Sequence, residues 1–351
     1  MTSTIGPVAS CKVVLAGTVA KRLLEEISEG LKKLEKPPLL VGFLANDDPA
    51  AHVHPVLIPS VPHRQTPYTN ALHCARSGFR FEIREVDREE LEEQILAANH
   101  DDHVDGIIVY YPIFGNRQDQ YLQQITDVSK DVEGLSHRYI FNMYQNIRFL
   151  DDENLQKSIL PCTPLAVIKI LEHLQIYNTI LPYGNRLFGH TITVINRSEV
   201  VGRPLAALLA NDGASVYSVD LTGIQHFTRG EGIKKRRHEV VEMSDWGLEN
   251  CLPLSDVVIS GVPGGNYKVP LNLLRGGAVC INFSSEKNFE AEVKEKASIY
   301  VPAIGKVTIV VLLRNLLRIV QNRQGSKTTP ATAVEKPGSV EEAAPSNQEN
   351  I

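Results

Sequence analysis

An apolar run in the middle of the chain ends in a short polar turn that could hold a phosphate. Run and turn read VINRSEVVGRP over residues 194–204 and pass directly into the amphipathic stretch RPLAALLAND. A strand that feeds a tight turn and a helix presents unpaired backbone N–H groups and the positive end of the helix dipole to an anion. Gly202 would let the helix start lie against a ligand, while Arg197 and Arg203 could add charged donors. Only one glycine stands where a dinucleotide fingerprint has three, so on spacing alone a purely structural turn is an equal alternative.

An acidic residue at the end of the next predicted strand strengthens the nucleotide interpretation. The segment ASVYSVD ends in Asp220, eighteen residues after Gly202, and Rossmann folds place a carboxylate about 20 residues beyond the glycines to bond the ribose. Such a carboxylate favours NAD, because it accepts bonds from the ribose hydroxyls and repels the 2′-phosphate of NADP. The plain alternative is an aspartate that caps a loop.

A basic run, Lys234-Lys235-Arg236-Arg237, follows further along the chain. It is a solvated loop, a nuclear localisation signal, or a phosphate clamp that would reverse the preference for NAD. The run begins far beyond the strand that ends in Asp220, which disfavours the clamp.

Two carboxylates in the first half of the chain form a second candidate site. Asp131 and Glu133 flank Val132 in SKDVEGLS. Paired carboxylates in a loop bind a metal, act as general acid and base, or hold a polar heterocycle, and solvated loop acids are the usual alternative. Asp131, just before Gly134, is placed to hydrogen-bond an amidine-like edge of a ligand. Cys162 in PCTP is either a nucleophile or, as we expect, a small buried residue.

Alternating strand and helix signals along the chain predict an α/β fold with largely parallel sheets. Residues 16–35 repeat apolar side chains at helical spacing (Val19, Leu23, Ile27, Leu31), and LLVGFLA at 39–45 is typical of a buried strand. Two further strands, FRFEIREV and VDGIIVYYP, enclose the helix REELEEQILAAN, and Pro112 closes the second strand. A helix at 163–174 is expected to begin with Thr163 as its N-cap and Pro164 at its first position.

A second α/β unit begins with the strand HTITVIN at 190–196. The helix after it ends at Gly213, and the strands SVYSVD, DVVISGV, AVCINF and IYVPAI follow. The last helix, 307–321, has one apolar face of Leu312, Leu313, Leu316, Leu317 and Val320, and a polar tail from 323 to 351 is expected to be disordered.

Composition excludes several classes of protein. The 351 residues are 43% apolar with a net charge of −5, which is ordinary for a globular protein and attracts neither nucleic acid nor an anionic membrane. No apolar run approaches the ~18 residues that a membrane helix needs. The start, MTSTIGPVAS, shows no targeting segment. Five scattered cysteines without C-x-x-C pairs indicate reduced thiols in the cytoplasm and no zinc site, and we expect no bound metal.

Five motifs occur in an order and spacing that resemble the methylenetetrahydrofolate dehydrogenase family, and most closely its monofunctional, NAD-dependent fungal branch. They are GIIVYYP, KDVEGL, LPCTP, INRSEVVGRP and GKVTIVVLLRN. The resemblance implies a folate-binding α/β domain at 8–160 completed by the helix 307–322, a Rossmann-type NAD-binding domain at 161–306, substrate in the cleft between them, and a homodimer. It implies oxidation of 5,10-methylenetetrahydrofolate to the methenyl form in one-carbon metabolism and purine synthesis.

The family motifs assign roles to particular residues of this chain. The pterin-binding Asp of the family falls on Asp131, and the resemblance places Tyr110 and Pro112 in the same folate site. The family motif R-S-x-x-V-G-x-P is the cofactor turn, and with its preceding Asn and the acidic residue of the next strand it assigns NAD contacts to Asn196, Arg197, Ser198, Val201, Gly202, Arg203, Pro204 and Asp220.

Two residues needed for a second activity of the family are missing. Bifunctional members also hydrolyse the methenyl product with a Lys that is supported by a Gln, and the Gln position here is Tyr110. No lysine stands between Lys36 and Lys130, so loss of the cyclohydrolase activity is predicted. The alternatives are an NADP-dependent bifunctional dehydrogenase/cyclohydrolase and a catalytically impaired protein that binds folate or NAD.

One interval departs from the family pattern. At 52–78 members continue into a helix that carries a Tyr, whereas this chain has His54 at that position and its next tyrosine is Tyr68. Four prolines forbid a helix over the early part, so only 68–77 can be helical. The interval is either a loop inserted over the cleft or a retained intron or wrong exon boundary at 52–67. The good fit of both flanking segments favours the second.

Overall fold

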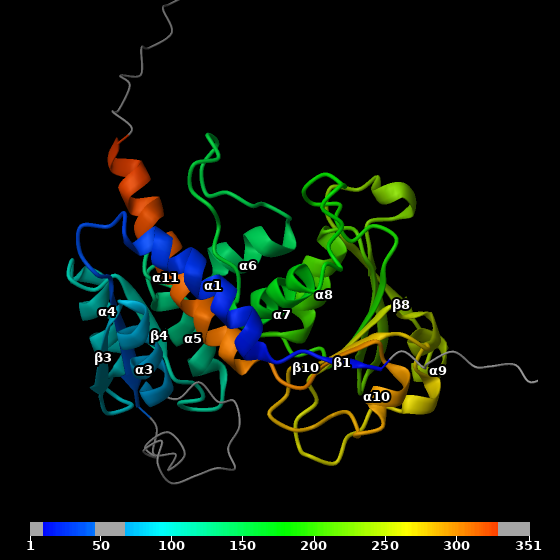
Figure 1. Cartoon of the computed structure of the whole chain (residues 1–351). Helices are drawn as coiled ribbons and strands as arrows, with labels where there is room; N and C mark the ends of the chain where they lie inside the picture. Colours follow the sequence, from blue (N-terminus) through cyan, green and yellow to red (C-terminus); the bar gives the residue numbers. More distant parts are fainter. Residues whose placement is uncertain (1–9, 46–66, 329–351) are drawn as a thin grey trace, which may run out of the picture.

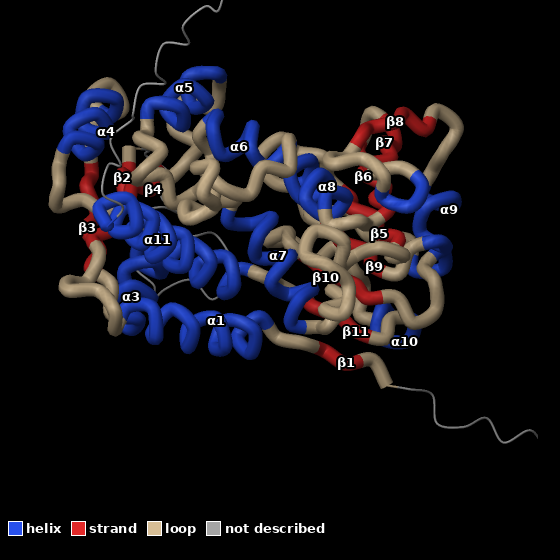
Figure 2. The backbone as a smooth tube through the Cα atoms, turned by 90° about the horizontal axis from the view of Figure 1, so that it is seen from above, coloured by secondary structure: helices blue, strands red, loops and turns tan. Residues whose placement is uncertain are grey.

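A computed structural model describes residues 10–45 and 67–328 of the chain. The segment from His52 to Thr66, where an insertion or wrong exon boundary was considered, lies outside the described residues, as does most of the polar tail. Figure 1 shows two lobes, each built around its own sheet, and Figure 2 shows the same arrangement from above.

The larger sheet has eight strands in the order β1-β11-β10-β9-β5-β6-β7-β8, and all neighbours are parallel except β6–β7 and β7–β8. The strands are β1 (Lys12–Val13), β5 (Thr191–Ile195), β6 (Ser215–Asp220), β7 (Gly223–Thr228), β8 (Glu239–Met243), β9 (Val257–Ser260), β10 (Val279–Asn282) and β11 (Ile299–Val301). The largely parallel α/β class predicted from the sequence is thereby confirmed. The short strand β1 belongs to this sheet, although it lies in the first stretch of the chain.

The smaller sheet has three parallel strands in the order β3-β2-β4, which are β2 (Leu39–Leu44), β3 (Arg80–Glu85) and β4 (Gly106–Val109). Both faces of the central strand β2 are buried, as its unbroken apolar sequence predicts. Leu40 belongs to the core that includes the helices α1 (Ala16–Leu31) and α11 (Gly305–Thr328), whereas Val41 and Phe43 pack with the cluster of α4 (Leu91–His100) and α5 (Arg117–Ile125).

Ten helices are described, together with three short 3₁₀ turns at Glu231–Ile233, Leu252–Leu254 and Leu271–Leu273. The helices are α1 (Ala16–Leu31), α3 (Pro67–Ser77), α4 (Leu91–His100), α5 (Arg117–Ile125), α6 (His137–Tyr144), α7 (Cys162–His173), α8 (Gly202–Asn211), α9 (Leu248–Cys251), α10 (Val293–Lys296) and α11 (Gly305–Thr328). The helix α3 confirms that the interval after Tyr68 is helical, as the proline positions predicted.

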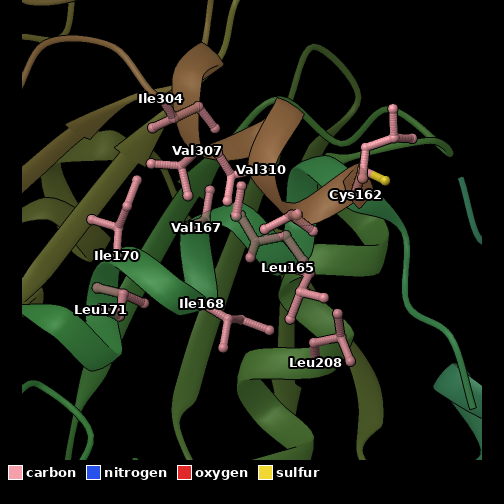
Figure 3. Close-up of a cluster of buried hydrophobic side chains, with 14 of the residues drawn as sticks. Cys162, Leu165, Val167, Ile168, Ile170, Leu171, Leu208, Ile304, Val307 and Val310 are labelled. Carbon is pink, nitrogen blue, oxygen red and sulfur yellow. The ribbon is translucent and has the colours of Figure 1, made fainter. Parts of the chain in front are cut away.

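The long helix α11 joins the two lobes. It lies beside α1, as Figures 1 and 2 both show, and it also packs against α7. At the crossing with α1, a Cβ on Gly30 would lie 2.5 Å from a methyl carbon of Leu317, so the small residue permits the close approach. Figure 3 shows part of the core around α7, in which Leu165 and Ile168 of α7 cluster with Leu208 of α8 and Val310 of α11.

Two predictions about element ends were wrong. The helix α7 begins at Cys162 with Pro161 as its N-cap, so Thr163 lies inside the helix and caps nothing. The predicted disordered tail does not begin at residue 323, because α11 continues to Thr328 and Arg323 donates to both the carboxylate and the carbonyl of Asp105. That contact, made to the lobe of the small sheet, gives the helix end a fixed partner.

The strands β7 and β8 were also missed. Residue Gly223, with φ of +120°, follows directly after the turn Leu221–Thr222 and lets β7 fold back on β6 as a hairpin. Neither segment carries the long apolar run of a buried parallel strand, and four of the five residues of β8 are exposed. Because both strands add to one edge of the sheet, they needed no such run.

Candidate active site

The turn after β5 lies at a crevice of the large sheet. The chain leaves β5 for β6 on one side, and it later returns as β9 on the other side of β5. The strand order therefore reverses at β5, and in open α/β sheets the ligand site lies outside the carboxyl ends of the strands at such a reversal. The turn 196–201 leaves β5 at that end and leads into the first residue of α8.

Gly202 is required by a close approach within this turn. A Cβ at this position would lie 1.7 Å from the carbonyl oxygen of Asn196 and 3.0 Å from Cα of Arg197. Neither neighbour is a flexible side-chain end, because both atoms belong to the backbone. The single glycine of the motif thus allows the helix start to fold tightly over the turn, so that the N–H group of Arg203 donates to the carbonyl of Ser198 at 3.0 Å.

Hydrogen bonds inside the turn hold this shape. Asn196 adopts a φ of +107°, which few residues other than glycine tolerate, and its side chain accepts a bond of 2.7 Å from the N–H of Ser198. The same side chain donates to the carbonyl of Gly261 at 2.6 Å, which ties the turn to the loop after β9. The hydroxyl of Ser198 accepts a 3.3 Å bond from the N–H of Gly202. Asn196 and Ser198 therefore shape the turn from within.

The two arginines of the motif are engaged away from the helix start. Arg197 donates to the hydroxyl of Thr222 at 2.6 Å, on the turn after β6, and Arg203 pairs with Glu199 at 2.9 Å. Because both guanidinium groups have these partners, the positive end of the α8 dipole remains as the candidate anion-binding feature of the turn. The remaining motif residues are half-buried Val201, which is the residue before the helix, and buried Pro204 in its first turn.

Asp220 is an exposed residue at the carboxyl end of β6, beside the same turn. The N–H of Asn196 donates to the carbonyl of Val219 at 3.0 Å, so the turn and the end of β6 are hydrogen-bonded neighbours. One carboxylate oxygen of Asp220 accepts the N–H of Leu221 at 2.8 Å. The residue caps its own hairpin turn, as the plain alternative predicted, and it also stands where the ribose interpretation requires a carboxylate.

The basic run at residues 234–237 lies at the far end of the β6–β7 hairpin. The strand β7 begins opposite Asp220 and ends at Thr228, about 17 Å away at 3.4 Å per residue. The run follows that far end, where Lys235 pairs with Glu239 and the carbonyl of Arg236 accepts from Asn146. A phosphate clamp beside Asp220 is therefore excluded.

On the substrate side, Asp131 is buried and its carboxylate is bound by its own loop. One oxygen accepts the N–H groups of Glu133 (3.1 Å) and Gly134 (2.8 Å), and the other accepts that of Ser136 at 2.7 Å. Burial nevertheless raises the pKa of Asp131, and these backbone bonds act in the opposite direction. In this arrangement the residue fixes the course of the loop.

The second carboxyl group, that of Glu133, accepts fewer backbone hydrogen bonds than that of Asp131. It is partly exposed and, with Asp131, lines a small pocket beside the end of β4. Desolvation first, and then the charge of Asp131, raise the pKa of Glu133 to about 8, while a bond from the backbone of Val109 lowers it. Near neutral pH its side chain therefore carries a proton for much of the time, and it can both donate and accept a hydrogen bond.

Tyr110 is nearly buried and has a partner that sequence reasoning missed. Its hydroxyl accepts a bond of 2.8 Å from the side-chain amide of Asn70 on α3, and within the described residues the amide oxygen of that buried asparagine has no partner. Gly42 of β2 leaves room for the ring, since a Cβ there would lie 3.1 Å from it. No signal in the sequence identified Asn70, because it stands in the interval that departs from the family pattern. Pro112 follows nearby, after a cis peptide bond with Tyr111.

A second missed residue holds the substrate loop from behind. The side chain of Asn315 on α11 is buried, and its amide donates to the carbonyls of Val132 and Leu160 at 3.0 Å each. It stands in the motif GKVTIVVLLRN, where a polar residue inside an apolar helix face was the available signal. Cys162 lies beside it, and burial raises the thiol pKa well above its ordinary value. The buried interpretation of Cys162 is thus supported over the nucleophile.

Two kinds of site are not found in the described part of the chain. No helix there combines the length and the apolar character that crossing a bilayer requires. No group of three or more His, Cys, Asp or Glu side chains is placed there to share a metal ion.

Comparison with known proteins agrees with this geometry. Residues 62–133 match the catalytic domain of the tetrahydrofolate dehydrogenase/cyclohydrolase family, and residues 161–233 match its NAD(P)-binding domain. A methylenetetrahydrofolate dehydrogenase [NAD(+)] of Schizosaccharomyces pombe is 56% identical over 89% of this chain and 94% of its own length. A bifunctional protein FolD of Campylobacter jejuni is 29% identical over 86% of this chain and 95% of its own.

A solved structure extends the likeness to the fold. The NAD-dependent 5,10-methylenetetrahydrofolate dehydrogenase of Saccharomyces cerevisiae superposes with a TM-score of 0.82 at 52% identity, covering 91% of this chain and 99% of that one. Likeness of this extent includes both lobes. The chain belongs to the tetrahydrofolate dehydrogenase/cyclohydrolase family.

Proposed function

We propose that this protein oxidises 5,10-methylenetetrahydrofolate to 5,10-methenyltetrahydrofolate with NAD as the hydride acceptor, and that it lacks cyclohydrolase activity. The observation that carries the proposal is the cofactor turn, where Gly202 folds the start of α8 over the end of β5 at the strand reversal. Relatives named for this NAD-dependent reaction are 44–56% identical over nearly the whole chain.

The turn fits a dinucleotide in shape and in hydrogen-bonding chemistry. Any side chain at Gly202 would fill the space between the helix start and the turn, where the hydroxyl and the carbonyl of Ser198 accept the N–H groups of Gly202 and Arg203. The positive end of the helix dipole and the hydroxyl of Ser198 would hold the pyrophosphate, with Asn196 keeping the turn in place and Val201 and Pro204 shaping the helix start. NAD, when bound, accepts the hydride from the folate.

Asp220 supports NAD over NADP. Its side chain is exposed beside the turn, and only one of its carboxylate oxygens has a hydrogen bond within the described residues, to the N–H of Leu221. The other oxygen is available for the ribose hydroxyls, whereas a 2′-phosphate would meet a like charge. Arg197, which reaches Thr222 on the adjoining turn, would hold the strand end that carries this carboxylate.

Two carboxyl groups on the substrate side, Asp131 and Glu133, have different roles. We infer that Asp131 acts through the loop that it fixes, since three backbone N–H groups occupy its oxygens. Glu133 then makes the direct contact, because its raised pKa lets it offer both a proton and an acceptor to the polar edge of a pterin. Tyr110 and Pro112 complete this side, with the Tyr110 ring held by Asn70.

The chemistry itself asks little of acid–base groups. The product is a cation shared between two nitrogens, so no proton has to be removed when the hydride leaves. The residues must chiefly hold the methylene carbon in place and exclude water, which is a matter of orientation. A buried tyrosine and a loop tied to α11 by Asn315 provide such a rigid wall.

The absence of cyclohydrolase activity rests on the groups that would activate water. Tyr110 stands in the position of the family Gln and has no amide, and the raised pKa of its buried hydroxyl disfavours its ionised form. The first lysine after Lys36 in the chain is Lys130. Its ammonium donates to the carbonyls of Ala98 and Asp101 at 2.9 and 2.7 Å, at the end of α4, and so it is no substitute.

A homodimer is proposed through the edge strand β8. This strand ends the large sheet, and Val240 and Val241 on it are 41% and 49% exposed. An open edge with apolar side chains is a template for pairing with another strand, and a second copy of β8 is the simplest partner. Replacing Val241 with Lys is expected to produce monomers in sedimentation. Unchanged dimers would exclude this edge.

We further propose that the protein works in the cytoplasm and supplies oxidised folates for purine synthesis. Its five cysteines are unpaired, and four of them are buried, which suits a reducing compartment. Localisation of a tagged chain tests the first part, and a purine requirement in a deletion strain tests the second.

Initial rates test the central proposal. Purified protein is mixed with 5,10-methylenetetrahydrofolate and either NAD or NADP, and formation of the reduced nucleotide is followed by absorbance. The expected result is turnover with NAD and little with NADP. Turnover with NADP alone would favour the bifunctional type of enzyme, and none with either would indicate a folate- or NAD-binding protein without activity.

A further inference from the structure

A cavity of about 150 Å³ lies at the other end of α8 from the cofactor turn. Leu208 and Asp212 line it at the carboxyl end of this helix, whereas Gly202 opens the helix at the turn. Ten residues at 1.5 Å each separate the two by about 15 Å. The cavity is therefore distinct from the site proposed for NAD.

The side chains around the cavity are predominantly basic. The basic residues that line it are Arg148, Lys157, Lys169, Arg186, Arg314 and Arg318, and the acidic ones are Glu172 and Asp212. Each acid already has a cation, since Asp212 pairs with Arg148 at 2.6 Å and Glu172 pairs with Lys169 at 2.7 Å. Asp212 also accepts a bond from the hydroxyl of Tyr177. The other four cations have no carboxylate partner among the described residues.

Two of these cations lie one helical turn apart on α11. Arg314 and Arg318 are both half-buried, and within the described residues neither guanidinium has an ion pair or a hydrogen bond to a protein acceptor. Burial, and then the charge of Arg314, hold the pKa of Arg318 below its usual range. Like charges at this spacing repel each other, and an anion bound beside the two guanidinium groups would reduce this repulsion.

A third cation faces the pair from the other lobe. Arg186 lies in the loop before β5, its buried Nε has no hydrogen-bond partner in the part of the chain that the structure describes, and its guanidinium carbon lies 5.6 Å from the ring centre of Tyr183. An unpaired buried donor is costly unless a ligand or water accepts from it. This donor is an independent sign that the cavity lacks its acceptor.

We propose that this cavity binds a phosphate-bearing anion, with Arg314, Arg318 and Arg186 as its main ligands and Lys157 at its edge. The planar fork of arginine matches phosphate oxygens with two parallel bonds, and several arginines around one cavity favour a multivalent anion over a single carboxylate. A cavity of about 150 Å³ has room for a group the size of pyrophosphate, and a larger ligand would extend outward past Tyr183, whose side chain is largely exposed.

The position of the cavity gives such binding a consequence. Arg314 and Arg318 come from α11 and Lys157 from the first half of the chain, whereas Arg186 comes from the lobe of the large sheet. A bound anion would therefore bridge both lobes. Asn315, the residue after Arg314, ties the loop of Asp131 and Glu133 to α11, so the anion would brace the substrate loop from behind. This inference does not depend on the proposed function.

Titration calorimetry with inorganic pyrophosphate at constant ionic strength tests the proposal. Wild-type protein is expected to bind saturably and to gain several degrees in its thermal midpoint, because a ligand that binds only the folded state stabilises it. Arg318→Gln should weaken binding by about tenfold or more, and Arg314→Gln with Arg318→Gln should abolish it. Arg22→Gln, which removes an exposed arginine from α1, is the matched control and should bind as the wild type does.

A milder variant guards against misfolding. Arg318→Lys keeps the charge and loses the fork, so it should bind pyrophosphate less tightly than the wild type and more tightly than Arg318→Gln. Full-strength binding by the folded double variant would overturn the proposal, and it would locate the pyrophosphate at another site such as the cofactor turn. Absence of saturable binding in the wild type, or equal weakening in Arg22→Gln, would overturn it as well.

Discussion

The cofactor turn and the substrate loop differ in what makes them. The turn is a backbone structure, in which Gly202 has no room for a Cβ and Asn196 adopts a positive φ. The substrate loop depends on side chains whose behaviour follows from burial, as for Glu133 with its raised pKa. A backbone requirement restricts which residue types can occupy a position and is therefore visible in the sequence, whereas a shifted pKa is not. The comparison teaches that a substitution should act through shape in the first region and through protonation in the second.

The largest effect is expected at Gly202. The change Gly202→Ala places a Cβ 1.7 Å from a backbone oxygen, so the turn must open, at about 3 kcal/mol or more in stability or in cofactor binding. Gly17→Ala is the matched control, because nothing lies within 4 Å of its added Cβ at the start of α1. It should change stability by less than about 1 kcal/mol, in the favourable direction. Denaturation and NAD titration measure both, and similar values would contradict the shape argument.

The next effect is pH-dependent and belongs to Glu133. The folded protein holds this proton up to a pKa of about 8, whereas the unfolded chain releases it near the ordinary value of 4.5. The unfolded state therefore binds fewer protons between these values, so stability contributed by this group falls as the pH rises through the interval. Glu133→Gln removes that dependence and should stabilise the protein at about pH 8 relative to about pH 5, by roughly 1 to 3 kcal/mol because the side chain is partly exposed.

Urea denaturation of both proteins at the two pH values measures the Glu133 effect. If the substitution has the same effect at both values, Glu133 does not titrate in this interval. The same change should impair folate turnover at every pH, because Gln offers a fixed donor and acceptor pair in place of an adaptable acid.

A smaller effect is expected where Asn70 donates to Tyr110. Asn70→Ala and Tyr110→Phe each break this bond, and the double variant should cost less than the sum of the two single changes, by about 1 kcal/mol. A double-mutant cycle of unfolding free energies measures this coupling. Strict additivity would show that the bond contributes nothing. The control is a second cycle that combines Tyr110→Phe with Asn99→Ala, which removes a bond to the carbonyl of Ile125.

The smallest effect concerns cofactor choice. Asp220→Ser replaces a charge that opposes the 2′-phosphate with a neutral hydroxyl, and about 1 kcal/mol corresponds to a roughly fivefold loss of preference for NAD. The ratio of kcat/KM for NAD to that for NADP measures it. If the variant keeps the ratio of the wild type, a residue other than Asp220 selects the cofactor.

Sequence patterns predicted the parts of this molecule that apolar spacing and backbone shape determine. The helices that became α1 and α11, the parallel strands and the turn with Gly202 all follow from such patterns. The hairpin strand β8 was missed because an exposed edge strand needs no apolar face. Asn70 was missed because its role depends on which side chain lies across from it, and local sequence does not contain that information.

The two carboxylates of KDVEGL illustrate the same limit. Both were recognised as candidates, and the family motif assigned the ligand contact to Asp131. The oxygens of Asp131 accept three backbone N–H groups, whereas Glu133 lines the pocket with a raised pKa. Two residues of similar chemistry, two positions apart, are distinguished by the direction of the loop, which only the three-dimensional structure provides.

A single progress curve tests the central claim most directly. Purified protein, NAD and 5,10-methylenetetrahydrofolate are followed in a buffer in which the methenyl product decays slowly, with NADH and methenyltetrahydrofolate measured together. The account predicts that both accumulate in equal amounts, since NAD takes the hydride and neither Tyr110 nor Lys130 activates water. NADH formation with enzyme-dependent loss of the methenyl product, faster than in buffer alone, would contradict it.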